Sequence, residues 1–132
     1  MLCYLQGRTH QQAARELGRP AGSMRPVYEV CASAISHLLP EGGKVIDLGA
    51  ATGRVAAVLA EHRPDAEIMA VDLSEEMVRA GRSALASEHL SDRVTMQVGD
   101  MRSFGELAPD DVAVVASSWA LENLPTLDDM HR

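Results

Sequence analysis

Residues 45–54 read Val-Ile-Asp-Leu-Gly-Ala-Ala-Thr-Gly-Arg, and no other part of the chain says more about its architecture. The apolar run Lys44–Leu48 is typical of a short buried strand, and residues 53–62 have the character of a helix. A glycine-rich turn between a strand and a helix lets a ligand approach the backbone and the helix N-terminus. This stretch therefore predicts a strand–turn–helix unit with a ligand site at the turn.

The same alternation continues on both sides of the turn. Further strands are expected at residues 67–72, 93–98 and 111–116, and further helices at residues 9–17, 22–38 and 74–90. Near-continuous apolar strands alternating with helices indicate a parallel sheet covered on both faces. The predicted fold class is therefore α/β, with a doubly wound, Rossmann-like and mainly parallel sheet.

Composition limits the other possibilities. The chain has 132 residues, of which 46% are hydrophobic and 23% charged, values typical of one soluble domain. It has no run of 18 apolar residues, so we expect no membrane span. The two cysteines have no metal-binding partners in sequence, which favours free thiols and a cytoplasmic location.

Charge is distributed unevenly along the chain. Residues 1–25 carry a net charge of +3, whereas residues 26–132 carry −10. This asymmetry predicts two parts, a helical segment at 1–25 and a domain at 26–132. The overall charge of −7 argues against a general binder of nucleic acids or anionic membranes.

The turn and the next strand favour a ligand that contains a nucleoside. Asp72 ends the second expected strand, where a carboxylate can accept hydrogen bonds from both ribose hydroxyls. A dinucleotide fingerprint that starts at Gly49 fails at Ala51 and at Arg54, and the Gly-Lys-Ser/Thr of a phosphate-binding loop is absent. Asp47 would repel a pyrophosphate but suits a ligand with an ammonium or sulfonium charge. S-adenosylmethionine carries both charges as well as a ribose.

Four motifs occur in one order along residues 26–128. They are Asp47-Leu-Gly49-x-x-Thr-Gly53, Val71-Asp72-Leu-Ser74-x-x-Met77, Gly99-Asp100-Met101 and the segment Asp111–Ser118. In this order and spacing they resemble the class I S-adenosylmethionine-dependent methyltransferases. The resemblance implies a methyltransferase that transfers a methyl group by in-line displacement to an unidentified acceptor, which we expect to be a small molecule.

The resemblance also implies roles for individual residues. The methionine end of the cofactor is expected at Asp47 and at the backbone of Gly49–Gly53, and the ribose at Asp72. The adenine is expected near Leu73, Met77, Asp100 and Met101, and the sulfur near Ser117. Ala51 departs from the family, which usually has glycine there, and its methyl group is expected to crowd the ligand. No residue identifies itself as a catalytic base, and no metal site is expected.

The resemblance further implies a sheet of seven strands in the order 3-2-1-4-5-7-6, of which four are recognisable here. We therefore expect a fragment or a truncated gene product that contains mainly the cofactor-binding part. The fourth expected strand would present an exposed apolar edge, which predicts self-association or pairing with a partner at that edge.

Residues 2–25 resemble part of the helix-turn-helix of bacterial sigma factors. The matching residues are Leu5-x-Gly7-x-Thr9, Ala13-Ala14-x-x-Leu17-Gly18 and a following Gly-Ser. The expected recognition helix is interrupted by Pro26 and continues into an apolar stripe, so DNA binding is not favoured. The alternatives to an enzyme are a DNA-binding regulator with a nucleoside-sensing domain, or an inactive fragment.

Overall fold

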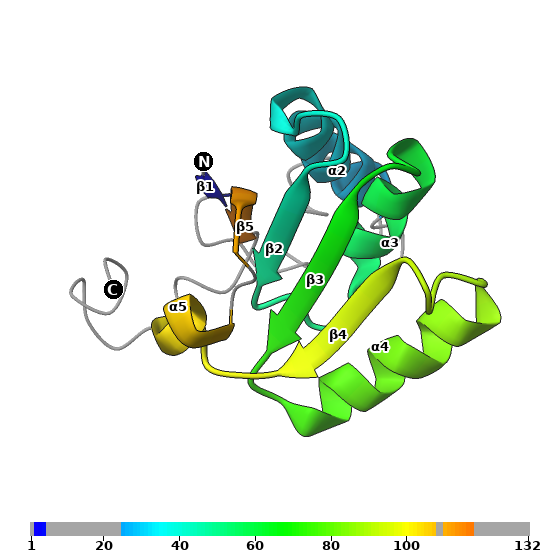
Figure 1. Cartoon of the computed structure of the whole chain (residues 1–132). Helices are drawn as coiled ribbons and strands as arrows, with labels where there is room; N and C mark the ends of the chain where they lie inside the picture. Colours follow the sequence, from blue (N-terminus) through cyan, green and yellow to red (C-terminus); the bar gives the residue numbers. More distant parts are fainter. Residues whose placement is uncertain (1, 5–24, 108–109, 118–132) are drawn as a thin grey trace.

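A computed structural model describes residues 2–4, 25–107 and 110–117. Its strands form one parallel sheet in the order β1-β5-β2-β3-β4. Figure 1 shows β2, β3 and β4 side by side, with their arrowheads at the same end of the sheet. The strands are β1 (Leu2–Tyr4), β2 (Lys44–Leu48), β3 (Glu67–Asp72), β4 (Val94–Val98) and β5 (Val112–Ser117).

Helices alternate with these strands as predicted. They are α2 (Arg25–Leu38), α3 (Arg54–His62), α4 (Glu75–Ser87) and the short α5 (Phe104–Leu107), which follows the 3₁₀ turn η1 (Met101–Ser103). Helix α4 ends three residues before the predicted residue 90, and the expected helix at 9–17 lies outside the described residues. The described helices include none that is long and apolar enough to cross a membrane.

The main core lies between the sheet and the three long helices. Alternate residues of the strands, such as Val45 on β2 and Ala70 on β3, share one buried cluster with Ile35 of α2, Leu59 of α3 and Leu85 of α4. The intervening strand residues point to the opposite face. There Ile46, Leu48 and Val71 form a smaller cluster with Met69, Met101, Val112 and Val115. This period of two is what a parallel strand with two buried faces requires.

The edge of the sheet differs from the expectation. β1 pairs with β5 in parallel, with Leu2 opposite Val115 and Tyr4 opposite Ser117. The prediction that the fourth expected strand has a free apolar edge is therefore wrong over these residues, and the self-association predicted there loses its premise. Residues 2–4 also lie within residues 1–25, for which the sequence predicts a helical segment. Three residues are too few for a strand pattern to be recognised in sequence, so the pairing strand was missed.

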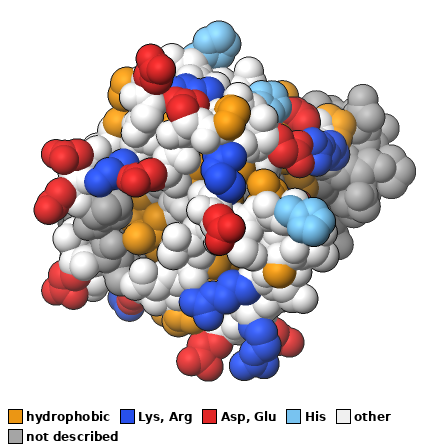
Figure 2. Space-filling view, turned by 45° about the vertical axis from the view of Figure 1, so that its right-hand side comes forward, with side chains coloured by type: hydrophobic (Ala, Val, Ile, Leu, Met, Phe, Trp, Pro, Cys, Tyr) orange, Lys and Arg blue, Asp and Glu red, His pale blue; other side chains and the backbone are white. Residues whose placement is uncertain are grey.

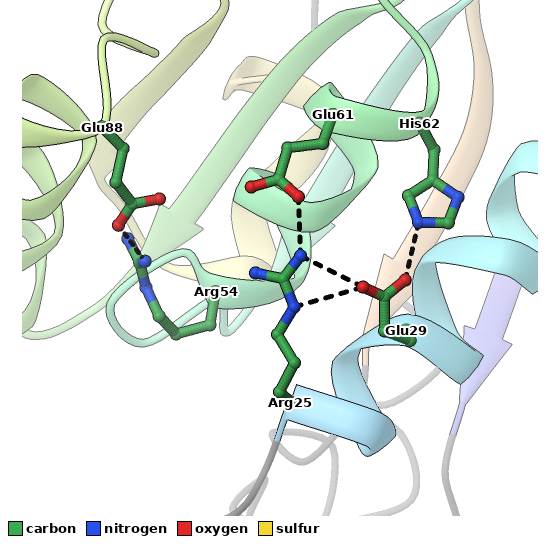
Figure 3. Close-up of polar contacts among 6 residues, drawn as sticks. All are labelled: Arg25, Glu29, Arg54, Glu61, His62 and Glu88. Carbon is green, nitrogen blue, oxygen red and sulfur yellow. Dashed lines mark hydrogen bonds and ion pairs between the residues drawn. The ribbon is translucent and has the colours of Figure 1, made fainter.

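Polar contacts join α2 to α3 along their solvent-facing sides (Figure 3). The Arg25 guanidinium contacts Glu61 Oε2 at 2.6 Å and Glu29 Oε1 at 3.1 Å. Glu29 also contacts His62 Nε2 at 2.6 Å, and its hydrogen bonds with His62 and Arg25 lower the pKa of Glu29. Because all four side chains are partly exposed, the network fixes the relative position of the helices more than it stabilises them.

A partly buried connection is made by Arg63, which directly follows α3. Its guanidinium donates to the carbonyl oxygens of Ser36, Leu39 and Pro40 at 2.7 to 2.9 Å. These carbonyls belong to the last turn of α2 and the residues after it, where a helix lacks partners for its C=O groups. Arg63 thus closes α2 at its C-terminus and holds it against α3.

Candidate functional site

The glycine-rich turn after β2 contains three residues with a left-handed backbone. Gly49, Ala51 and Gly53 have φ values of 70°, 52° and 73°. The N–H groups of Gly49 and Ala50 donate to the Val71 carbonyl at 2.8 and 2.9 Å, and Gly53 N–H donates to the Ala50 carbonyl at 2.8 Å. The turn is thus folded tightly against the end of β3, and it leads directly into α3.

Ala51 is strained in this turn because a Cβ disfavours the left-handed region by about 1–2 kcal/mol. We expect Ala51→Gly to stabilise the protein by about 0.5–1 kcal/mol, since the greater entropy of unfolded glycine offsets part of the relief. Urea unfolding measures the change. Ala50→Gly is the matched control, because Ala50 has no positive φ and should lose stability. A loss of stability in Ala51→Gly would contradict the prediction.

Asp72 connects three loops at the carboxyl end of the sheet. Its Oδ2 accepts the Ala51 N–H at 2.8 Å, and its Oδ1 accepts the Ser74 N–H at 2.9 Å. Its backbone carbonyl accepts the Gly99 N–H at 3.0 Å. The half-buried carboxylate of Asp72 therefore holds the loops after β2 and β3, and its backbone carbonyl holds the loop after β4.

Asp47 is the buried acid of this region. It lies on β2, is 5% exposed, and has Ala70 of β3 and Ala116 of β5 as its register neighbours. Burial and, as the smaller cause, the negative charge of Asp72 together raise the pKa of Asp47 to about 7. The structure thus brings Asp47 and Asp72 together, as the order of the motifs predicts.

Asp100 lies in the loop after β4, close to the end of β3. Its carboxylate binds the Arg102 guanidinium through both oxygens, with contacts of 2.6 to 3.1 Å, and accepts the Arg102 backbone N–H at 2.9 Å. These contacts lower the pKa of Asp100 and keep its charge. Met101 is half-buried and packs on the small cluster that contains Leu48 and Val71.

Three large apolar side chains near these acids are exposed to solvent. Leu73 is 70% exposed, Met77 44% and Val98 39%. Leu73 follows β3 directly, Met77 lies in the first turn of α4, and Val98 ends β4. Ser74 caps α4 by accepting the Met77 N–H at 3.2 Å, which fixes where Met77 emerges. Large exposed apolar groups that gather near polar ones are typical of a ligand site.

Ser117 ends β5 and is completely buried. Within the described residues its Oγ has no hydrogen-bond partner. An unsatisfied buried hydroxyl costs about 1–3 kcal/mol, so such a group is typical of a position that a ligand or another side chain completes. Ala116 lies opposite Asp47 in the β2–β5 register, which places Ser117 next to the glycine-rich turn.

Gly81 supports the site from α4 and was not singled out from the sequence. A Cβ at this position would overlap the end of the Met96 side chain and would lie 2.9 Å from the Thr52 carbonyl oxygen in the turn. Met96 is flexible, but the Thr52 backbone has little freedom to move. The absence of a side chain therefore lets α4 approach the glycine-rich turn.

We expect Gly81→Ala to destabilise the protein by about 1–2 kcal/mol, although alanine favours helix by about 1 kcal/mol. Overpacking against the turn outweighs that gain. Thermal unfolding measures the difference. Gly105→Ala in α5 is the matched control, because a Cβ there meets nothing within 4 Å. Equal stability of Gly81→Ala and the native protein would show that α4 can move away from the turn without cost.

A hollow of about 400 Å³ lies at the opposite end of the strands. It is lined by Lys44, Val45, Ala66, Glu67, Ile68, Met69, Asp92, Arg93 and Thr95. None of the predicted site residues is among them. The hollow is at the amino ends of β2, β3 and β4, whereas open α/β sheets bind ligands at the carboxyl ends.

The sequence did not indicate two other features of the site. Arg102 forms the ion pair with Asp100, and Val98 adds an exposed apolar side chain at the end of β4. The spacing of two residues between Asp100 and Arg102 was the available signal for the ion pair. No pattern in the sequence indicated that Val98 is exposed, since a strand residue in an apolar run is normally buried.

A parallel sheet with a left-handed glycine turn, and with acids at or near the carboxyl ends of β2, β3 and β4, defines a Rossmann-like protein. The chain belongs to the methyltransferase domain family, whose family model matches residues 45–132. The predicted membership of the class I S-adenosylmethionine-dependent methyltransferases and the predicted fold class are therefore confirmed.

Individual relatives agree with this assignment. The chain is 33% identical over 108 residues to malonyl-[acyl-carrier protein] O-methyltransferase of Methylococcus capsulatus, which covers 82% of this chain and 38% of the relative. It is 31% identical over 96 residues to trans-aconitate 2-methyltransferase of Azoarcus sp., which covers 71% of this chain and 36% of the relative. The chain thus spans well under half the length of these two relatives.

Solved structures share the fold. A protein described as an S-adenosyl-L-methionine-dependent methyltransferase from Methanococcus maripaludis superposes with a TM-score of 0.72 at 21% identity, over 95% of this chain and 57% of that one. A methyltransferase from Geobacter sulfurreducens in complex with S-adenosyl-L-homocysteine superposes with a TM-score of 0.56 at 25% identity, over 70% of this chain and 35% of that one.

Proposed function

We propose that the chain binds S-adenosylmethionine at the carboxyl ends of β2, β3 and β4, as the cofactor-binding part of a methyltransferase. The observation that carries the proposal is the joining of three loops around Asp72, next to the buried acid Asp47. A relative whose structure contains S-adenosyl-L-homocysteine supports it. The methionine end would lie at Asp47 and the backbone of Gly49, Ala51 and Gly53.

The remaining contacts follow the same edge of the sheet. The ribose would lie at Asp72, whose carboxylate oxygens each retain a lone pair beyond their present N–H donor. The adenine would lie against Leu73 and Met77, with Asp100 accepting from its amino group and Met101 beside it. The buried Ser117 hydroxyl would face the sulfur end. The chemistry of these donors and acceptors fits the cofactor.

Methyl transfer from a sulfonium group requires little catalytic assistance from the protein. When bound, the cofactor supplies a methyl group that its sulfonium has already activated for in-line displacement. The chain's own residues bind the cofactor, orient it and exclude water. We propose a small-molecule acceptor, which the name of the trans-aconitate relative supports. A cytoplasmic location remains a prediction from the cysteine content.

The DNA-binding alternative receives no support from the relatives, which are methyltransferases. Residues 5–24, which contain most of the helix-turn-helix resemblance, lie outside the described residues. On the face shown in Figure 2, acidic and basic side chains are interspersed and form no continuous basic surface. A DNA-binding face normally concentrates lysine and arginine.

Calorimetric titration with S-adenosyl-L-homocysteine, the demethylated product, tests the proposal. We expect one site per chain with a Kd of about micromolar order. NAD is the control ligand and should not bind, because the dinucleotide fingerprint fails at Ala51 and Arg54. A folded chain that binds neither compound would overturn the proposal.

A further inference from the structure

Asp47 differs from the other acids near the site in having no counter-charge. Asp72 accepts two backbone N–H groups, and Asp100 binds Arg102. Within the described residues no hydrogen bond reaches the Asp47 carboxyl group, and Asp47 is only 5% exposed. A buried carboxylate without donors is unfavourable, so burial favours the protonated form of the group until a cation or a donor arrives.

The charged and titratable groups around Asp47 confirm this isolation. From β3 it faces Asp72, a like charge. α2 carries Arg25, Tyr28, Glu29, Cys31 and His37, and α3 carries Arg54, Glu61 and His62. Arg25, Glu29, Glu61 and His62 contact one another, and Arg54 forms an ion pair with Glu88. Val112–Ser117 on β5 contains no titratable side chain. None of these groups supplies Asp47 with a positive partner.

We propose that Asp47 gives up its proton to solvent when the ammonium end of the cofactor binds, so that cofactor binding is coupled to proton release. This inference rests on the proposed function. The O–H bond of the Asp47 carboxyl group breaks, its electron pair stays on the carboxylate, and the proton leaves to the buffer. The ligand thereby gains a charged partner that the free protein does not display.

The coupling predicts a pH-dependent affinity. Because the pKa of Asp47 is about 7 in the free protein, binding must remove a proton below this pH and none well above it. The Kd for S-adenosyl-L-homocysteine, which has the same ammonium group, should therefore weaken about tenfold from pH 8 to pH 6. In Asp47→Asn the affinity should be lower at pH 8 and should vary little with pH.

Calorimetry at pH 7 in two buffers of different protonation enthalpy measures the released proton directly. We expect about half a proton per bound S-adenosyl-L-homocysteine, because about half of the Asp47 groups are protonated at this pH. Asp92→Asn, an exposed carboxylate at the other end of the strands, is the matched control and should leave this value unchanged.

The outcomes separate the two proposals. Binding without proton release by the native chain overturns the coupling but leaves the cofactor site intact. Proton release that persists in Asp47→Asn assigns it to another group and also overturns the coupling. Absence of binding by the native chain overturns both. If Asp47→Asn binds too weakly to measure, carbon NMR can follow the titration of the Asp47 carboxyl group in the native chain, with and without the ligand. The coupling requires the midpoint of this titration to fall by more than about one pH unit when the ligand is added. A smaller change overturns the coupling.

Discussion

Asp47→Asn is expected to have a pH-dependent effect on the free energy of unfolding of the ligand-free protein. The effect should be more stabilising at pH 8 than at pH 4.5, by about 2–4 kcal/mol. The reason is the raised pKa of Asp47, about 7 in the folded chain against 3.8 for an unperturbed group. Between these two values the folded state holds a proton that the unfolded state has lost. The native protein therefore loses stability as the pH rises through this window, and asparagine, which does not titrate, removes that loss.

Urea unfolding of both proteins at pH 4.5, 6 and 8 measures this difference. The comparison at each pH cancels the contribution of the other acids, among them Asp65, whose pKa is lowered by Arg63 and by the Gly42 N–H. Asp92→Asn again serves as the control and should show no such trend. A stability difference that does not change with pH would show that the Asp47 carboxyl group finds a counter-charge in solution.

Asp72→Ala is expected to weaken binding of S-adenosyl-L-homocysteine by about 1–3 kcal/mol, or roughly tenfold to a hundredfold. Removal of the carboxylate takes away the acceptor for the ribose hydroxyls. It also frees the Ala51 and Ser74 N–H groups, which the carboxylate now binds at 2.8 and 2.9 Å. Calorimetric titration of the variant and the native chain gives the difference.

A second ligand separates the two effects of Asp72→Ala. A 2′,3′-dideoxy analogue of S-adenosyl-L-homocysteine cannot donate to Asp72 from its ribose. The native chain should therefore prefer the hydroxylated ligand, and Asp72→Ala should lose that preference. Equal preference in both proteins would assign the whole effect of Asp72→Ala to the loops and would remove the ribose from this carboxylate.

The elements around the turn could be predicted because their signals are local. β2 and β3 have the predicted bounds, and Ser74 caps α4 as its position before Glu75 indicates. The positive φ values at Gly49 and Gly53 follow from the residue type itself. In each case the residues that decide the conformation lie within a few positions of one another.

Other parts of the site depend on contacts between distant segments. From the sequence, Gly81 is a glycine that lowers the helix propensity of its segment. The close approach of α4 to the glycine-rich turn explains why a side chain is absent there. The apolar neighbours of Asp47 predict its burial, but the absence of a donor and the influence of Asp72 require the register of β2 on β3. Such properties arise from the pairing of segments, so no local pattern reveals them.

The position of β1 has a consequence for the order of folding. Its three residues pair with Val115–Ser117, so this contact closes a loop of more than a hundred residues. Closure of so long a loop costs conformational entropy, and the few contacts of a three-residue strand offset little of it. We therefore expect β1 to pair with β5 late in folding, after β2, β3 and β4 have formed. During synthesis, Leu2–Tyr4 are therefore made well before β5, the last of the described strands, with which they pair. A fast N-terminal cleavage or a bulky N-terminal fusion would act in that interval, and would change the edge of the sheet at which Tyr4 pairs with Ser117.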